Sequence, residues 1–204
     1  MKLHWSPRSP FVRKVMIAAH ELGLVDRIAC VRTLVAMDKP HAGLMRDNPL
    51  SKIPTLVLDD GTVLYDSCVI CEYFDGLDGR NRLFPASSRQ RLLALRRHAL
   101  GNGFLDLTIL RRSERDRPAE RQSAPHLAAY ALKTTATLAA LEAEADNLDR
   151  VTFDIGGIAI GCALGYLDFR FTDEPWRPGH PRLAAWHASL AARPSVIATH
   201  PIDA

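Results

Sequence analysis

The chain has 204 residues and a formal net charge of +3, with 47% hydrophobic and 24% charged residues, as expected of a globular protein with one or two domains. Its arginines are scattered rather than gathered into one aromatic-rich patch, which gives no reason to expect a nucleic-acid partner. Charged residues interrupt the N-terminal stretch, and no apolar run approaches the roughly 18–20 residues that span a bilayer, so we expect a cytoplasmic protein without a membrane segment.

The N-terminal stretch predicts a strand, a turn and a capped helix. Leu3–Trp5 suits a buried strand, and Ser9 followed by Pro10 suits the N-cap and first position of a helix that ends at Gly23. A helix N-terminus favours anions, so the Ser9 hydroxyl lies where a thiolate or a carboxylate would be stabilised. From these residues alone, a Ser9 that only caps the helix and a Ser9 that also serves a ligand are equally good interpretations.

The rest of the first half predicts three more strands and a second capped helix. Asp59-Asp60-Gly61 is a hairpin turn between two strands, and Asp66 and Ser67 have the chemistry of a helix cap. Residues 33–48 are irregular, with room for one short helix. The order of elements predicts one mixed sheet with helices packed on it. We expect the strands at residues 28–32, 55–58 and 62–65, and the helix from residue 67 to about residue 78.

The second half predicts helices alone, after a turn-rich stretch at residues 76–85. One helix is apolar on nearly all sides, which is typical of a helix buried in the middle of a bundle, and its glycines permit close helix approach. Gly101 and Gly103 are expected to weaken the middle of another helix. The four helices are expected at residues 88–113, 124–147, 154–171 and 180–193.

The four cysteines, at positions 30, 68, 71 and 162, are too few for a disulfide framework. Cys68 and Cys71 have C-x-x-C spacing, but they fall inside an expected helix. A redox pair has its first cysteine at a helix N-terminus, where the thiol pKa is lowered. We therefore interpret these two as structural thiols. No second Cys or His pair lies at ligand spacing, so no metal site is expected.

Four features of the sequence are each weak signals alone, but their order and spacing together are specific. They are Ser6-Pro-Arg-Ser-Pro-Phe-Val-Arg-Lys-Val15 after the first strand, Lys52-Ile53-Pro54 before the third, Asp66-Ser67 after the hairpin, and the buried helix over residues 155–170 followed by Arg193-Pro-Ser195. In these features the chain resembles the glutathione S-transferase superfamily, and most of all a bacterial, serine-type member. The resemblance implies a thioredoxin-like α/β domain with a mixed four-stranded sheet (residues 1–78), a linker (79–87) and an all-α helical bundle (88–204). It also implies a homodimer.

The resemblance implies that Ser9 hydrogen-bonds the glutathione sulfur and stabilises its thiolate, as a donor rather than as a base. A hydroxyl and a helix N-terminus both favour the charged form of a thiol, whose free pKa is about 8.5. Ser6 is the rival donor, although it lacks the capping position ahead of Pro10. The Ser6-Pro-Arg-Ser9 turn has no cysteine where thioredoxin-like proteins have C-x-x-C, so conjugation is favoured over disulfide exchange.

Five further residues are implied to hold the rest of glutathione. The Ile53 backbone would meet the cysteinyl amide through a cis bond to Pro54, Asp66 and Ser67 would hold the γ-glutamyl end, and Lys52 would pair with the glycyl carboxylate. Each has a simpler alternative: Lys52 as a solvated loop charge, Asp66 and Ser67 as helix caps only, and Pro54 as a trans strand start.

The sequence departs from the family at two more positions. Asp66 stands where the family more often has Glu, so its reach toward a ligand amine is shorter. Asp154 can cap the buried helix, but Gly157 stands where many members have Asp, so the reciprocal bond of a capping box is missing.

The resemblance implies transfer of glutathione, as co-substrate and without a metal, to a small and largely apolar electrophile. The second pocket is expected between the two domains. Its candidate lining residues are Trp5, Pro7 and Phe11 on one side, and Phe104, Leu107, Arg111 and Trp176 on the other. Two alternatives stay open: a non-catalytic binding or regulatory protein on the same fold, and a glutathione-dependent isomerase or dehalogenase.

Overall fold

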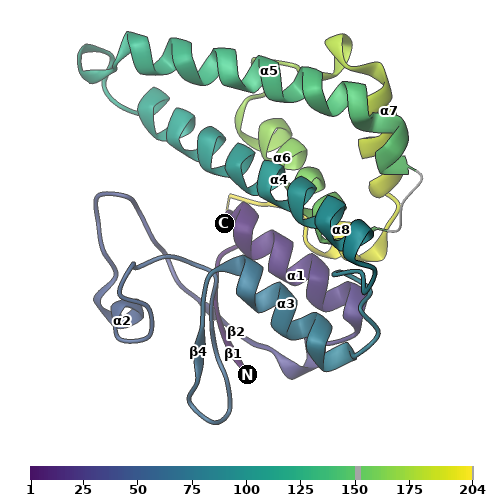
Figure 1. The fold of residues 1–204 in the computed structure, drawn as a ribbon. Helices are drawn as coiled ribbons and strands as arrows, with labels where there is room; N and C mark the ends of the chain where they lie inside the picture. The colour runs from purple at the N-terminus through teal and green to yellow at the C-terminus, as the bar shows by residue number, and fades with distance from the viewer. Residues whose placement is uncertain (150–152, 204) are drawn as a thin grey trace. The chain divides into compact units, whose positions relative to one another are not determined.

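The structure is a computed structural model that describes residues 1–149 and 153–203. The chain divides into two compact units, an α/β unit formed by Met1–Arg91 with Arg193–Ala204, and a helical unit formed by Leu92–Ala192. Figure 1 shows the strands confined to the N-terminal part of the chain and long helices in most of the rest. Among the described residues, no helix is both long and apolar enough to cross a membrane.

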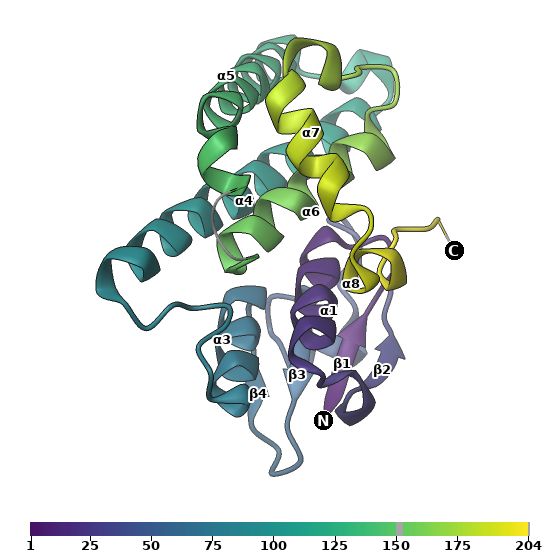
Figure 2. The same ribbon diagram turned by 90° about the vertical axis from the view of Figure 1, so that its right-hand side faces the viewer.

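The described residues of the α/β unit contain a four-stranded mixed sheet, which confirms the predicted fold class. β1 and β2 run parallel, whereas β3 runs antiparallel to both β1 and β4. Figure 2 shows the strands in the order β4, β3, β1, β2 from left to right. The strands are β1 (Lys2–Trp5), β2 (Ala29–Arg32), β3 (Thr55–Val57) and β4 (Val63–Leu64).

Helix α1 (Pro10–Leu22) begins and ends as the sequence predicted. Ser9 is its N-cap, with Pro10 in the first turn, and Gly23 follows its last residue. Gly23 has a φ of 68°, the left-handed conformation that glycine adopts without strain and that commonly ends a helix. The helix is amphipathic, and its apolar side chains, such as Val12 and Val15, are buried.

Helix α3 (Ser67–Asp78) packs beside α1, and Figure 2 shows both helices on one face of the sheet. Asp75, near its end, is 3% exposed and accepts hydrogen bonds from the backbone N–H groups of Leu83 at 3.0 Å and Phe84 at 2.9 Å. One carboxylate therefore holds the turn that leaves α3. Two shorter helices complete the unit before α3: η1 (Val25–Arg27) and α2 (Ala42–Met45).

The last predicted helix, over residues 180–193, is wrong in its length. Helix α7 (Pro181–Leu190) ends at Leu190, and a separate short helix, α8 (Pro194–Ala198), follows. A residue that precedes proline is disfavoured in the helical region, and Arg193 is accordingly extended, with φ −72° and ψ 129°. Pro194 therefore starts a helix here as well as preventing the earlier one from continuing.

The segment that contains α8 belongs to the α/β unit because it is fastened to α1. Glu21 accepts hydrogen bonds from Arg193 at 2.8 and 3.1 Å and from the Ser195 hydroxyl at 2.5 Å. Burial acts to raise the pKa of Glu21, but these hydrogen bonds and the charge of Arg193 outweigh it, so the pKa lies below its ordinary value.

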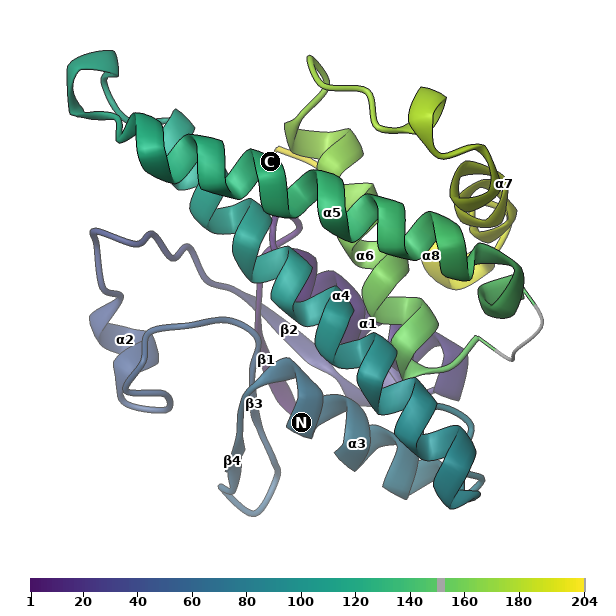
Figure 3. The ribbon, with the colours of Figure 1, turned by 45° about the horizontal axis from the view of Figure 1, so that its top comes forward.

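The helical unit is built on two long helices, α4 and α5, that lie side by side and run in opposite directions (Figure 3). Arg97 donates to Glu144 at 2.8 Å and links the two. Helix α6 is buried along almost all of its length, as its uncharged sequence predicted. Its N-cap is Asp154, whose Oδ1 accepts from the Gly157 N–H at 2.9 Å. The helices of this region are α4 (Ser88–Arg115), η2 (Ala119–Arg121), α5 (Ala124–Asp149), α6 (Ile155–Arg170), η3 (Arg177–Gly179) and α7.

The two glycines of α4 have different roles. A Cβ at Gly101 would lie 2.7 Å from the Ala159 carbonyl carbon, so α4 and α6 approach each other there at a distance that only glycine allows. A Cβ at Gly103 would meet nothing within 4 Å. Gly101 therefore has a packing role that the sequence did not predict, beside its expected weakening of the helix.

Candidate active site

The topology of the α/β unit brings three loops to one end of its sheet. His4 pairs with Thr55 and Leu56 pairs with Leu64, and β3 runs antiparallel to both neighbours. The end of β1, the start of β3 and the end of β4 therefore lie together. The loops and helix starts at this end carry all the residues expected to contact glutathione: Ser9, Lys52, Ile53, Pro54, Asp66 and Ser67.

Ser9 is half-buried at the start of α1. Its Oγ accepts a hydrogen bond from the Val12 N–H at 3.3 Å, which makes it the helix cap. This bond uses a lone pair of Oγ, so the cap does not consume the hydroxyl proton, which is free to donate elsewhere. Ser6 is only 5% exposed, and its Oγ lies 3.5 Å from the Arg8 nitrogen. The greater exposure and the helix-terminal position favour Ser9 as the donor to a ligand.

The start of α3 forms the second side of this end of the sheet. Asp66 is exposed, and its Oδ1 accepts from the Cys68 N–H at 2.8 Å. Ser67, the first helical residue, is 1% exposed. The peptide bond between Tyr65 and Asp66 is cis. The first turn of a helix of this length presents N–H groups that suit a carboxylate.

The third side is the loop before β3. The Ile53–Pro54 bond is cis, as the resemblance implied. Ile53 is buried in a cluster with Val12 of α1 and Leu44 of α2, whereas the Lys52 side chain is exposed. The loop therefore has an anchored apolar side chain next to a basic one in solvent.

Asn48 is a residue of this loop that sequence reasoning missed. It is 1% exposed, and its Nδ2 donates to the Lys52 carbonyl at 3.1 Å and to Thr55 Oγ1 at 2.9 Å. Its Oδ1 accepts from the Leu50 N–H at 3.0 Å. Thr55 Oγ1 also donates to the Lys52 carbonyl, at 2.8 Å. The available signal was Asn48-Pro49, which marks a turn but does not predict a buried amide.

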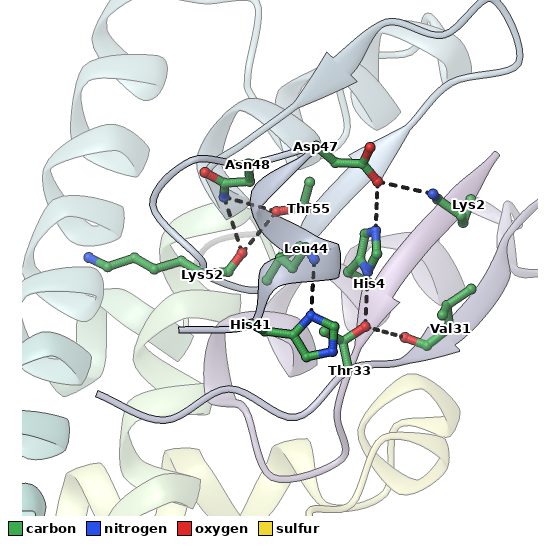
Figure 4. Close-up of polar contacts among 10 residues, drawn as sticks. All are labelled: Lys2, His4, Val31, Thr33, His41, Leu44, Asp47, Asn48, Lys52 and Thr55. Carbon is green, nitrogen blue, oxygen red and sulfur yellow. Dashed lines mark hydrogen bonds and ion pairs between the residues drawn. The ribbon is translucent and has the colours of Figure 1, made fainter. Parts of the chain in front are cut away.

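A second group that sequence reasoning missed is centred on His4 of β1, and Figure 4 shows it together with Asn48, Lys52 and Thr55. His4 is 7% exposed; its Nδ1 lies 2.9 Å from Thr33 Oγ1 and its Nε2 lies 2.9 Å from Asp47 Oδ2. Lys2 also contacts Asp47 Oδ2, at 3.0 Å. The hydrogen bonds from His4 and Lys2 hold the pKa of Asp47 below its ordinary value.

The residues expected to line a second-substrate pocket have varied surroundings. Trp5 packs against the buried cluster of Val12, Leu44 and Ile53 and is therefore partly a core residue. Pro7 and Phe11 are half-buried.

In the helical unit, Arg111 and Trp176 line one cavity of about 290 Å³. Arg111 is 7% exposed, donates to Glu174 at 2.6 and 2.7 Å, and stacks over Phe171 with its guanidinium 5.0 Å from the ring centre. Phe104 is buried at 2% exposure, and neither it nor Leu107 lines this cavity. The structure thus brings two of the four helical candidates together.

The two cysteines at C-x-x-C spacing lie within α3. Cys71 is buried and Cys68 is half-buried, and burial raises the pKa of the Cys68 thiol. This direction is opposite to that of a reactive redox thiol. Among the described residues, no group of three or more His, Cys, Asp or Glu side chains is placed to hold a metal ion.

Comparison with known proteins identifies the family. The family models described as "Glutathione S-transferase, N-terminal domain" and "Glutathione S-transferase, C-terminal domain" match residues 8–77 and 124–189. The chain is 32% identical over 203 residues to the "Uncharacterized GST-like protein YibF" of Escherichia coli strain K12, with 98% of each chain covered.

Solved structures agree with this assignment. A glutathione transferase family member from Pseudomonas fluorescens Pf-5, with bound glutathione, is 43% identical, with a TM-score of 0.95 and 98% of both chains covered. A glutathione S-transferase from Methylobacillus flagellatus KT, also with glutathione bound, is 32% identical, with a TM-score of 0.88, and the match covers 98% of this chain and 99% of that one. The chain therefore belongs to the glutathione S-transferase superfamily.

Proposed function

We propose that this protein is a serine-type glutathione S-transferase that activates bound glutathione for attack on a small, largely apolar electrophile. The observation that carries the proposal is the convergence of three loops at one end of the sheet, with the Ser9 hydroxyl at a helix N-terminus among them. Glutathione in two structures that resemble this chain supports the choice of ligand.

Ser9 acts in this proposal as a hydrogen-bond donor to the sulfur. Its Oγ accepts from Val12 N–H while its proton is directed to the thiolate, so the same group caps α1 and stabilises the nucleophile. The thiol proton is released to solvent. The sulfur electron pair then forms a bond to the electrophilic carbon, and the leaving group departs with its own electron pair.

The other residues bind rather than react. Ser67, at the start of α3, holds the γ-glutamyl carboxylate, and Asp66 faces the γ-glutamyl amine. The Ile53 backbone meets the cysteinyl amide, and the exposed Lys52 ammonium meets the glycyl carboxylate. These roles leave the sulfur next to Ser9.

For the electrophile we retain the residues expected from the sequence: Trp5, Pro7, Phe11, Phe104, Leu107, Arg111 and Trp176. Arg111 and Trp176 have the best support, since they line a common cavity with apolar neighbours. We also propose that the protein is cytoplasmic and forms a homodimer. Light scattering of the purified protein after size exclusion will test the homodimer.

The test compares Ser9→Ala with Ser6→Ala in conjugation of glutathione to a chlorodinitrobenzene. We expect Ser9→Ala to lower kcat by about a hundredfold to a thousandfold, as loss of one preorganised donor to an anion does. The kcat of Ser6→Ala is expected to stay within about threefold of the wild-type value, because a substitution that removes no interaction with the ligand changes the free energy by only about 0.5 kcal/mol. Full activity of Ser9→Ala across pH would remove Ser9 from the mechanism.

A second measurement separates the alternative functions. Retention on immobilised glutathione and a glutathione-induced rise in Tm are expected for a transferase, an isomerase or a dehalogenase. Absence of both would favour a non-catalytic protein on the same fold. Retention without conjugation would direct the search to isomerase or dehalogenase substrates.

A further inference from the structure

The Lys52–Ile53 peptide, in the loop before β3, is held by hydrogen bonds from two buried side chains. Its carbonyl oxygen accepts from Asn48 Nδ2 at 3.1 Å and from Thr55 Oγ1 at 2.8 Å, and these two donors are themselves 2.9 Å apart. Asn48 and Thr55 are buried, at 1% and 0% exposure, so water does not compete for these bonds. The carbonyl therefore has one well-defined direction.

Fixing this carbonyl also fixes the neighbouring N–H. A peptide unit is planar, and in a trans unit the C=O and the following N–H point in opposite directions. The Lys52–Ile53 bond is trans, so the Ile53 N–H is directed away from Asn48 and Thr55. The buried Ile53 side chain prevents the unit from rotating as a whole.

The residue before Asn48 anchors the loop to the sheet. Asp47 Oδ2 contacts His4 Nε2 at 2.9 Å and Lys2 Nζ at 3.0 Å, and both belong to β1. Helix α2 is only one turn long, and Leu44 is its one buried residue, so burial alone holds it weakly. The ion pair to β1 supplies the missing attachment.

Both ring nitrogens of His4 have a partner. Nε2 lies 2.9 Å from the Asp47 carboxylate, which can only accept, and Nδ1 lies 2.9 Å from the Thr33 hydroxyl oxygen, which also lies 3.1 Å from the Val31 carbonyl. The charged groups that face this ring among the described residues are Asp47 and, through it, Lys2.

We propose that Asn48 and the His4–Asp47 pair are positioning residues of the glutathione site, which hold the Ile53 N–H in the direction needed to bind the cysteinyl part of glutathione. The proposal rests on the glutathione transferase function proposed above. It makes binding depend on a histidine that does not touch the ligand. Removal of the His4–Asp47 contact loosens the loop and therefore lowers the affinity for glutathione.

The experiment measures the Kd of S-methylglutathione by calorimetry, because this ligand has no thiol for Ser9 to ionise. Asn48→Ala and Thr55→Val each remove a donor to the Lys52 carbonyl, and we expect each to raise Kd by about tenfold, as loss of one positioning hydrogen bond does. Thr55→Val preserves the shape of the side chain, so it keeps the test decisive if Asn48→Ala does not fold. The matched control is Glu21→Gln, which weakens the same unit away from these loops and is expected to leave Kd unchanged.

The role of His4 is tested by substitution. Kd is measured for the wild type, His4→Gln and His20→Gln. We expect His4→Gln to bind several times more weakly than the wild type, because it loses the contact with Asp47, whereas His20→Gln is expected to bind as the wild type does.

The outcomes separate the inference from its premise. A wild-type protein that does not bind S-methylglutathione overturns the proposed function. A wild type that binds, with folded Asn48→Ala or Thr55→Val of equal affinity, overturns the role of the braced carbonyl. A folded His4→Gln variant that binds S-methylglutathione as tightly as the wild type overturns the role of the His4–Asp47 pair. In the transferase assay, the positioning role predicts a raised KM for glutathione with kcat nearly unchanged at saturation.

Discussion

The two units of this protein differ in where they use buried polar residues and close-packed glycines most. In the α/β unit, buried polar side chains such as Asn48 and Asp75 bind the backbone of loops and fix its direction. In the helical unit, glycines such as Gly101 and Gly156 let helices come close. Arg97 of α4 pairs with Glu144 of α5, and Arg111 of α4 pairs with Glu174 in the loop after α6. In the proposed function the α/β unit binds glutathione partly through loop backbone, so the direction of its peptide groups matters, whereas the helical unit depends on the fit between its helices.

The largest expected effect tests the close helix approach. Gly101→Ala places a methyl 2.7 Å from the Ala159 carbonyl carbon and 2.9 Å from the Ile160 nitrogen, where only backbone could yield. We expect the free energy of unfolding to fall by about 2–3 kcal/mol, the cost of overpacking. Gly103→Ala is the matched control two positions along, with nothing within 4 Å of the new methyl. The free energy of unfolding of Gly103→Ala is expected to rise by about 0.5–1 kcal/mol. Urea denaturation measures both, and equal behaviour of the two variants would contradict the assignment.

The next effect tests the backbone-binding carboxylate of the α/β unit. Asp75→Ala leaves the buried N–H groups of Leu83 and Phe84 without their acceptor, and we expect a loss of about 2 kcal/mol. Glu72→Ala, in the same helix, removes only a surface pair with Arg91, at 2.5 Å, and is expected to cost about 0.5 kcal/mol. Thermal unfolding compares them. A cost for Glu72→Ala as large as that for Asp75→Ala would show that buried backbone partners do not distinguish this unit.

The smallest effect tests the C-terminal segment and depends on pH. Glu21→Gln weakens the bonds to Arg193 and Ser195, and we expect a loss of about 1 kcal/mol at pH 7. Because the pKa of Glu21 is lowered in the folded protein from its ordinary value of 4.5, its contribution is complete above that value and is lost as pH falls through the folded pKa. The difference between the variant and the wild type should therefore shrink toward acid pH. Asp26→Asn, an exposed site on η1, is the control, and an undiminished difference at acid pH would argue against the ion pair.

Much of the fold could be predicted because its signals are local. The Ser9, Asp66 and Asp154 caps bind N–H groups two or three residues away, and Gly23 ends its helix through its own φ. The buried α6 follows from a run of apolar residues within one helix. The end of α7 was predicted less well. Pro194 restricts only the residue before it, so it did not indicate that the helix ends three residues earlier, at Leu190.

Much of the candidate site could be predicted from the family resemblance, but its supporting residues could not. His4 and Asp47 are 43 positions apart, and no sequence pattern links two residues at that separation. Lys14 belongs to a residue type that is normally exposed, yet it is fully buried in α1, with its ammonium 5.7 Å from the Phe11 ring centre. Arg97 on α4, another residue of a type that is normally exposed, is also buried.

The sequence by itself determined most helix and strand boundaries, although not the end of α7, because capping, turn formation and hydrophobic periodicity act over a few residues. It also placed the candidate glutathione residues in three loops. Only the tertiary structure decided which of the remaining polar residues are buried and what they bind. A buried amide such as Asn48 is stable only when its partners are in place, and those partners depend on how distant strands pair. The direction of the Ile53 N–H, on which glutathione binding is proposed to depend, is therefore a property of the folded sheet.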